Sequence, residues 1–105
     1  MDLYWADEDA AYIRSRSTRH PGATDIEPEW TLEVLADERL VELSPYPASR
    51  VGASGFIGSS PSAGQVLAVI AYRDLDGDVH GMNAWPASGR DLRSYLKEGE
   101  DGGEA

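Results

Sequence analysis

An uninterrupted apolar and aromatic run, Val-Leu-Ala-Val-Ile-Ala-Tyr, occupies residues 66–72 and restricts the folds open to this chain. Polar and apolar residues do not alternate in it, which is typical of a strand that is covered on both faces. The run is far shorter than the about 20 residues that a membrane-spanning helix needs. The sequence therefore predicts a central strand of a sheet, with other elements packed against both faces.

The segments on either side of this run predict antiparallel neighbours. The Asp-Gly dipeptide at 76–77 is a strong turn signal, after which residues 79–84 are expected to return as a strand. Before the run, residues 59–64 have the composition of a hairpin loop and residues 40–43 that of a short strand. Residues 50–57 are expected to be irregular, because two glycines there indicate a bulge or a close approach of the backbone. Together these segments predict an antiparallel β-meander.

Two helices are predicted before the meander. A short strand at residues 3–5 leads into a helix that opens at residues 6–9, with acids at 7–9, and carries Arg14 and Arg16 in its last turn. This arrangement of charges suits the helix dipole. The second helix is expected over residues 28–37, since it begins with a proline, which is favoured in a first turn.

The last helix is predicted to start at Ser88. Ser88 and Asp91 have the spacing of a capping box. Leu92, Tyr95 and Leu96 repeat at helical spacing and are expected to face the sheet.

The order of these elements is a short N-terminal strand, two helices, an antiparallel β-meander and a C-terminal helix. It predicts one α+β domain over residues 1–97, followed by an acidic, glycine-rich tail over 98–105 that is expected to be disordered. The absence of cysteine excludes disulfides and thiolate chemistry. The acids at 74–78 lack the glycine and distal glutamate of a calcium loop, and no metal or cofactor is expected. The N-terminal residues do not resemble a secretory signal, so we expect a cytoplasmic protein without membrane association.

The formal net charge of −10 argues against general polyanion binding, because phosphate contacts need Lys and Arg. Two positive groups nevertheless stand out, and together they could meet one phosphate-bearing ligand. They are Arg14, Arg16, Arg19 and His20, and Arg90, Arg93 and Lys97. The alternative is that both groups are solvated helix faces.

His20 is the first candidate for chemistry, since Arg19 precedes it and a Pro-Gly pair follows it. In metal-free cleavage of a phosphodiester, a histidine can move a proton while a guanidinium stabilises the charge on the phosphorane. The alternative is a surface histidine at a helix end, where the dipole favours it.

Asn83 and Trp85 are the second candidates. Side chains alternate along a strand, so these two are expected on one face and Met82 and Ala84 on the other. If Ala84 points to the core, Trp85 faces a groove or solvent, where it suits base stacking or anchoring of a partner. A partly buried tryptophan that covers the core is the alternative.

Taken in order, these segments resemble the BrnT family, toxins of type II toxin–antitoxin pairs with a RelE-like ribonuclease fold. The segment at 19–22, Arg-His-Pro-Gly, is similar to the Lys-His-Gly segment of the family. Residues 50–58 match its Arg-x-x-x-Gly strand, and residues 82–85, Met-Asn-Ala-Trp, its Ile-Ser-Ala-Arg segment. Residues 87–95 take the place of its closing helix, which ends in tyrosine. The resemblance covers the chain to about Lys97.

This resemblance implies an mRNA-cleaving toxin that is neutralised in a complex with a cognate antitoxin protein. It implies attack of the ribose 2′-hydroxyl on the adjacent phosphate, without a metal or cofactor. The implied catalytic residues are His20 as acid or base, Arg19, Arg90 and Tyr95. The implied substrate-binding residues are Arg50, Asn83, Trp85 and Arg93.

Two positions depart from the family pattern. Trp85 stands where the family has an arginine, and the closing helix lacks the family's glutamate, with Asp91 one position away. Losing one charge-stabilising donor typically costs a factor of about a hundred or more in rate, so Arg90 or Arg93 must supply the charge or the activity is weak or lost. We therefore keep two alternatives: a catalytically inert protein of this fold that acts through a protein partner, and an unrelated small α+β ligand-binding domain.

Overall fold

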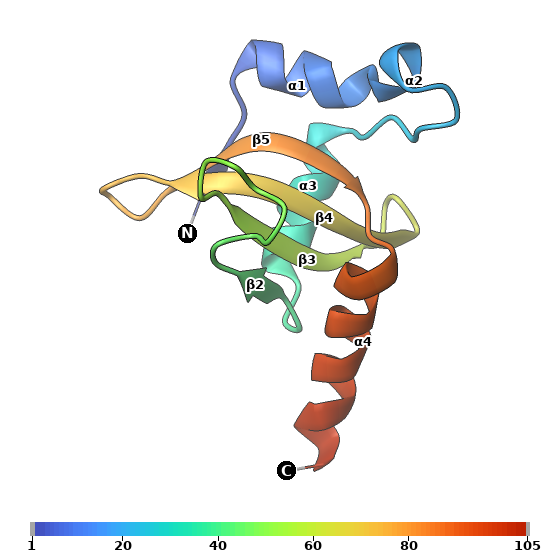
Figure 1. Ribbon diagram of the computed structural model, residues 1–105, viewed down its shortest axis with the longest axis vertical. Helices are drawn as coiled ribbons and strands as arrows, with labels where there is room; N and C mark the ends of the chain where they lie inside the picture. The colour runs from blue at the N-terminus through green and yellow to red at the C-terminus, as the bar shows by residue number, and fades with distance from the viewer. Residues whose placement is uncertain (1, 105) are drawn as a thin grey trace.

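Strand β4 (Gln65–Arg73) lies at the centre of a five-stranded sheet in the computed structural model, as the apolar run predicts (Figure 1). The structure describes the backbone of residues 2–104 and the side chains of residues 2–97. The strand order is β1 (Leu3–Tyr4), β5 (Val79–Pro86), β4, β3 (Ser54–Ser60) and β2 (Val41–Leu43). Strand β1 runs parallel to β5 and all other neighbours are antiparallel, so the sheet is mixed.

Over residues 2–104, four helices complete the fold and confirm the α+β class. They are α1 (Asp7–Arg14), α2 (Arg16–Arg19), α3 (Pro28–Ala36) and α4 (Gly89–Glu104). The predicted disorder of residues 98–105 falls outside the residues whose side chains are described and stays a prediction. Within residues 2–104, no helix is both long enough and apolar enough to cross a membrane.

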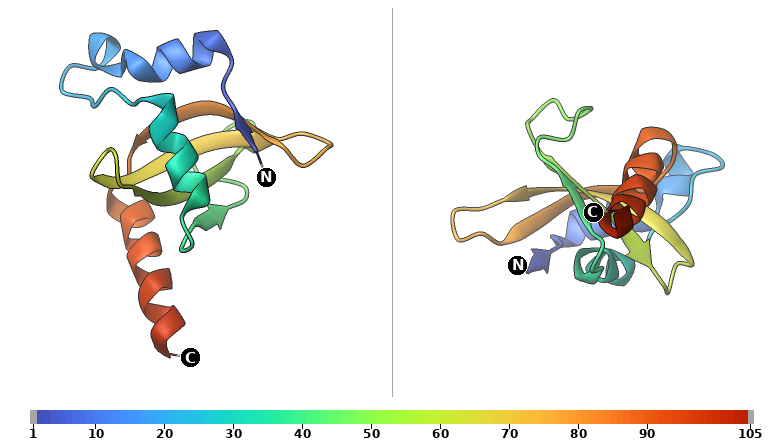
Figure 2. Two further views of the ribbon diagram at one scale, coloured as in Figure 1. Left: turned by 180° about the vertical axis from the view of Figure 1, so that it is seen from behind. Right: turned by 90° about the horizontal axis from the view of Figure 1, so that it is seen from below.

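One face of the sheet carries the main core and is crossed by α3, as Figure 2 shows from behind. We call it the α3 face. Its fully buried strand residues include Phe56, Val69 and Ala84, and they pack against Ile13 of α1 and Val34 of α3. Burying each large apolar side chain contributes about 1.5–3 kcal/mol, so this face accounts for much of the stability.

The opposite face, which we call the α4 face, is covered only in part. The first turns of α4 pack on it through Tyr95, against Ile57 and Ala68 of the neighbouring strands. Further along, α4 projects beyond the sheet (Figure 1). The prediction that Leu96 faces the sheet is therefore wrong, and its side chain is 54% exposed.

The region predicted to be irregular contains a strand instead. Residues 54–57 pair with residues 68–71 of β4 and are buried, and the apolar side chains of Phe56 and Ile57 pack on opposite faces of the sheet. The predicted close approach is confirmed at Gly55, where a Cβ atom would lie 2.3 Å from the ring of Tyr46. The hairpin loop is correspondingly shorter than predicted, because β3 extends to Ser60.

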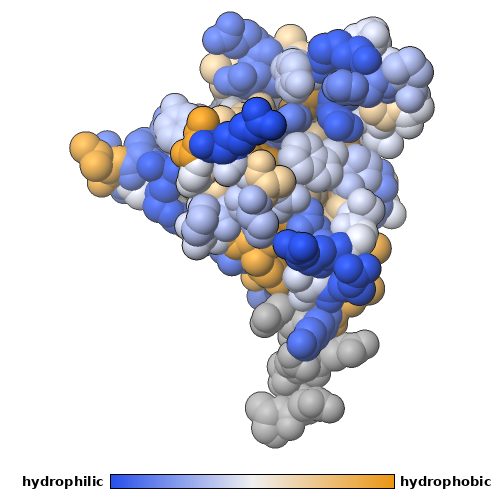
Figure 3. Space-filling view, in the orientation of Figure 1, coloured by the Kyte–Doolittle hydropathy of each residue, from blue (hydrophilic) through white to orange (hydrophobic). Residues whose placement is uncertain are grey.

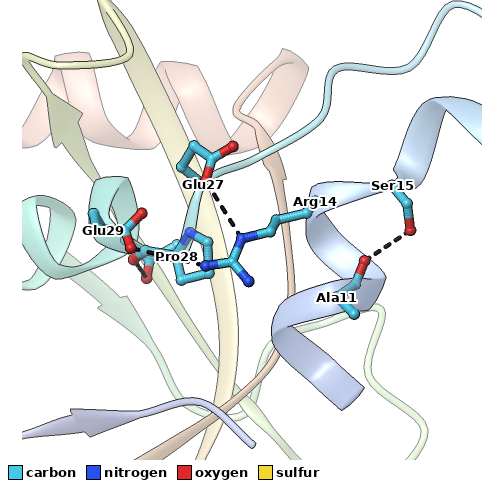
Figure 4. A network of polar contacts seen from close by, with 7 residues as sticks. Ala11, Arg14, Ser15, Glu27, Pro28 and Glu29 are labelled. Atoms are coloured by element: carbon cyan, nitrogen blue, oxygen red, sulfur yellow. Dashed lines mark hydrogen bonds and ion pairs between the residues drawn. The ribbon is translucent and has the colours of Figure 1, made fainter. Parts of the chain in front are cut away.

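The first predicted helix is interrupted at Ser15, which separates α1 from α2. The Ser15 hydroxyl donates a 2.7 Å hydrogen bond to the carbonyl of Ala11, a local bond that competes with the helix ladder (Figure 4). Arg14 then reaches from the end of α1 towards Glu27 and Glu29, at 3.4 Å and 3.8 Å. These half-exposed ion pairs tie α1 to the start of α3.

Candidate functional site

The uncovered part of the α4 face is hollowed into two adjoining cavities of about 360 and 400 Å³. The central cavity is lined by Asp9, Tyr12, Tyr46, Ala48, Ser49, Ile70, Met82, Asn83 and Trp85. The second cavity is lined by Tyr46, Pro47, Ala48, Trp85, Ser88, Arg90 and Asp91. Since they share Tyr46, Ala48 and Trp85, they form one continuous depression, which we call the sheet-face groove. Figure 3 shows pale, weakly polar surface on this face between more hydrophilic stretches.

A β-bulge shapes the floor of this groove. Ile70 pairs with Asn83 while the next residue, Ala71, pairs with Gly81, which leaves Met82 as the extra residue of β5. Asn83 and Trp85 lie on one face and Ala84 is buried on the other, as predicted. The assignment of Met82 to the face of Ala84 is wrong, because the bulge turns it into the central cavity.

Tyr46 forms one wall of the groove, at the point where the loop 44–53 folds over the α4 face. Its hydroxyl donates a 2.6 Å hydrogen bond to Oδ2 of Asp91, and its ring meets Trp85 edge-on with centroids 6.2 Å apart. Burial, together with the bond to Asp91, raises the pKa of Tyr46 to about 12, so it remains a donor at physiological pH. The sequence reasoning missed this residue, although an aromatic side chain between two prolines in a polar loop marks an ordered position.

Asp91 is buried and does not cap its helix in the way its spacing predicts. Within the described residues, its carboxylate bonds to Tyr46 and no capping bond joins it to the backbone of Ser88. The prediction of a capping box is therefore wrong for the side chain of Asp91, because its carboxylate accepts a hydrogen bond from the hydroxyl of Tyr46 instead. The amide of Asp91 still donates to the carbonyl of Ser88, at 3.1 Å.

Arg19 lines neither cavity but contacts Tyr12, a residue of the central one. Its guanidinium stacks 3.9 Å from the ring centroid of Tyr12, which lines that cavity, and it also donates to the carbonyl of Tyr12 and to Oγ of Ser15. The next residue, His20, ends α2 with an exposed side chain that lines neither cavity. The Arg19-His20 pair therefore does not belong to the lining of the groove, and Arg19 is connected to it through its contact with Tyr12.

The other predicted cations divide into two kinds. Arg90 lines the second cavity, whereas Arg93 and Arg50 are exposed and line neither cavity of the groove. Arg14 and Arg16 have structural partners, in the acids at the start of α3 and in the carbonyl of Thr24. Two cations of the first positive group are thus bonded within the fold, which neither the shared phosphate ligand nor the solvated helix face predicts.

Tyr95 lies apart from the groove. Its side chain is only 6% exposed, and its hydroxyl donates a 2.6 Å hydrogen bond to Oδ2 of Asp37. The same oxygen accepts the amide of Ser59, so Tyr95 joins α4 to the end of α3 and to β3. Burial and the bond to Asp37 raise the pKa of this tyrosine.

The groove therefore combines three aromatic side chains, one amide, one cation and two carboxylates, and a second cation, Arg19, stacks on one of its aromatic rings. Flat aromatic surfaces stack on planar ligands, and guanidinium groups bind phosphate. Within residues 2–97, no group of three His, Cys, Asp or Glu side chains could hold a metal ion. No model of a known protein family and no curated protein sequence matches this chain. The residues of the groove are therefore the basis for assigning a function.

Proposed function

We propose that this protein is the toxin component of a type II toxin–antitoxin pair, a BrnT-like protein with a RelE-like fold that binds single-stranded mRNA in the sheet-face groove and cleaves it. The order of elements supports this proposal, because a short strand, helices, an antiparallel meander and a closing helix are what the resemblance to BrnT implies. The proposed partner is the cognate antitoxin.

The observation that carries the proposal is the order of side chains along the groove. Arg19 stacks on Tyr12, which lines the central cavity, and Arg90 lines the second cavity, which shares Trp85 with the first. A single-stranded nucleic acid has the matching pattern, because its phosphates need cations while its bases stack on aromatic rings. Only a few phosphates are engaged in this arrangement, so the net charge of −10 does not prevent binding.

The proposed reaction uses Arg19 and His20. The ribose 2′-oxygen attacks the adjacent phosphorus, the bond from phosphorus to the 5′-oxygen breaks, and a 2′,3′-cyclic phosphate forms. His20 takes the 2′-hydroxyl proton or supplies one to the leaving 5′-oxygen, solvent water carries out the other of these two proton transfers, and Arg19 stabilises the phosphorane. Since His20 is exposed and free of the packing that holds Tyr95, it can turn towards a bound phosphate. Arg90 and Arg93 hold neighbouring phosphates.

The test is cleavage of an mRNA transcript by the purified protein, with the two histidines as a matched pair. His20→Ala is expected to lower the rate of cleavage by about a hundredfold or more. His80→Gln is the control, because His80 bonds to Asp74 in the β4–β5 hairpin, away from the groove. Growth arrest on expression, relieved by the protein encoded in the adjacent reading frame, is the matching result in cells. Equal rates in both variants would contradict the role of His20.

A second candidate function is a catalytically inert protein of the same fold that acts only through a protein partner. Two observations favour it. Trp85 occupies the position of the family's arginine, and the buried hydroxyl of Tyr95 is already hydrogen-bonded to Asp37. In that case the folded protein cleaves no RNA and causes no growth arrest, yet forms a stable complex with its neighbour-encoded partner.

A further inference from the structure

The central cavity contains an amide whose orientation is fixed by the strand on which it lies. The backbone N–H of Ala87, which follows β5, donates to the carbonyl of Val66 in β4. Because successive N–H groups of a strand point to opposite sides, the N–H of Ala84 points away from β4. Oδ1 of Asn83 accepts a 2.9 Å hydrogen bond from this N–H of Ala84. The oxygen of the side chain is thus turned to the backbone, and the Nδ2 amino group, which has no partner in the described part of the chain, is left as a donor.

Asp9 supplies an acceptor in the same cavity. Asp9 and Tyr12 are three residues apart on α1, so both point to the side of the helix that faces the cavity. The carboxylate of Asp9 is half-buried and has no hydrogen-bond partner within residues 2–97. An ionised carboxylate only accepts, and its two oxygens can accept two parallel bonds.

We infer that the central cavity binds a guanine base. Among the four RNA bases, guanine alone offers two adjacent N–H donors, N1–H and the 2-amino group, which match the two oxygens of Asp9. Its O6 acceptor lies next to them and matches the Nδ2 donor of Asn83. Trp85 and Tyr46 provide the aromatic surface on which the base stacks.

The same groups disfavour adenine. Its Watson–Crick edge has a single donor, the 6-amino group, beside the N1 acceptor, whose lone pair would face a carboxylate oxygen. Asparagine usually reads adenine by accepting from its amino group and donating to a ring nitrogen. Asn83 does not present that pair of atoms, because Ala84 holds its Oδ1. The cavity therefore selects guanine over adenine.

This inference rests on the proposed function, since it assumes that the groove holds RNA. The test measures affinity by fluorescence anisotropy with labelled pentanucleotides that are 2′-O-methylated, so that they cannot be cleaved. Three probes differ only at the central base, which is guanine, adenine or hypoxanthine. Guanine is expected to bind about tenfold more tightly than adenine. Hypoxanthine, which lacks the 2-amino group, is expected to fall between them.

Variants assign the preference to the two side chains. Asp9→Asn keeps the shape but removes the double acceptor, and is expected to bring the affinities for guanine and adenine to within about threefold. Asp7→Asn is the matched control, because it removes another acid from the first turn of α1 that does not line the cavity. Asn83→Asp replaces the free donor with an acceptor and is expected to abolish the preference while Ala84 keeps its bond.

The outcomes separate the two claims. Equal binding of all three probes, or a preference for adenine, would overturn the guanine site and leave RNA binding in place. A guanine preference that persists in Asp9→Asn would also overturn it. If no probe binds, the proposed function fails together with this inference.

Discussion

The hydroxyl of Tyr46 lies 2.6 Å from Oδ2 of Asp91, and this bond joins the loop 44–53 to the first turn of α4. It is the contact that closes the wall shared by both cavities of the groove. The aromatic ring also packs directly on the backbone of Gly55. The shape of the candidate site therefore depends on a loop residue held from two sides.

Tyr46→Phe removes only the hydroxyl and leaves the buried carboxylate of Asp91 without its donor. We expect a loss of about 1–3 kcal/mol in the free energy of unfolding, since a buried acceptor then lacks its partner. Urea denaturation measures this change. Tyr72→Phe is the control, because Tyr72 is an exposed residue of β4 outside the groove. Equal stability of both variants would show that the loop is not held by Asp91.

Gly55→Ala tests the packing of the same ring. The added Cβ would lie 2.3 Å from the Tyr46 ring, so the ring must move and the bond to Asp91 is strained. We expect a loss of about 1–3 kcal/mol, as overpacked cores show. If this clash causes the destabilisation, the double variant Gly55→Ala/Tyr46→Ala loses less free energy of unfolding than the sum of the losses in the two single variants. Additive effects in this double-mutant cycle would refute the contact.

Glu33 gives the stability a defined pH dependence. Its oxygens accept bonds from the hydroxyls of Ser62 and Ser60 and from the amide of Ser62, which lower the pKa of this carboxyl below its ordinary value of 4.5. A lowered pKa in the folded state means that the stabilisation is complete above about pH 4.5 and is lost as pH falls through the folded pKa.

Glu33→Gln is therefore expected to flatten the acid limb of the stability curve, with little change in its slope near pH 7. Thermal unfolding of the wild type and of Glu33→Gln, measured between pH 3 and pH 7 at steps of about half a pH unit, checks this expectation. Glu38→Gln serves as the matched control, because Glu38 is exposed. An acid limb equally steep in wild type and Glu33→Gln would assign the dependence to other carboxyls.

Trp85→Ala removes the aromatic surface shared by the two cavities. Base stacking on an aromatic side chain contributes about 1–3 kcal/mol, so the affinity for a non-cleavable single-stranded RNA should fall by about tenfold or more. Trp85→Phe keeps a ring and should retain most of the affinity, which separates stacking from loss of fold. Equal affinity of wild type and Trp85→Ala would place the RNA elsewhere.

The sequence predicts the scaffold better than the groove. The central strand, its hairpins and the helix starts follow from local patterns. An apolar run, an Asp-Gly turn and helix-start residues are each recognised within a few neighbouring positions. The bulge at Met82 cannot be read from alternation, because an inserted residue shifts the period without changing composition. The bonds from Tyr46 to Asp91 and from Tyr95 to Asp37 join residues 45 and 58 positions apart, which local patterns do not encode.

Binding of RNA in the sheet-face groove is tested by comparing two double variants that remove the same charge. Arg19→Gln/Arg90→Gln neutralises the cation that stacks on Tyr12 and the cation that lines the second cavity, whereas Arg39→Gln/Lys97→Gln neutralises two exposed cations without contact to the groove lining among the described residues. Their affinities for a non-cleavable single-stranded RNA are measured by anisotropy at several salt concentrations. We expect the groove variant to lose about twentyfold or more in affinity and to show a shallower salt dependence, with the control close to wild type. Equal losses in both variants would contradict binding of RNA in the sheet-face groove.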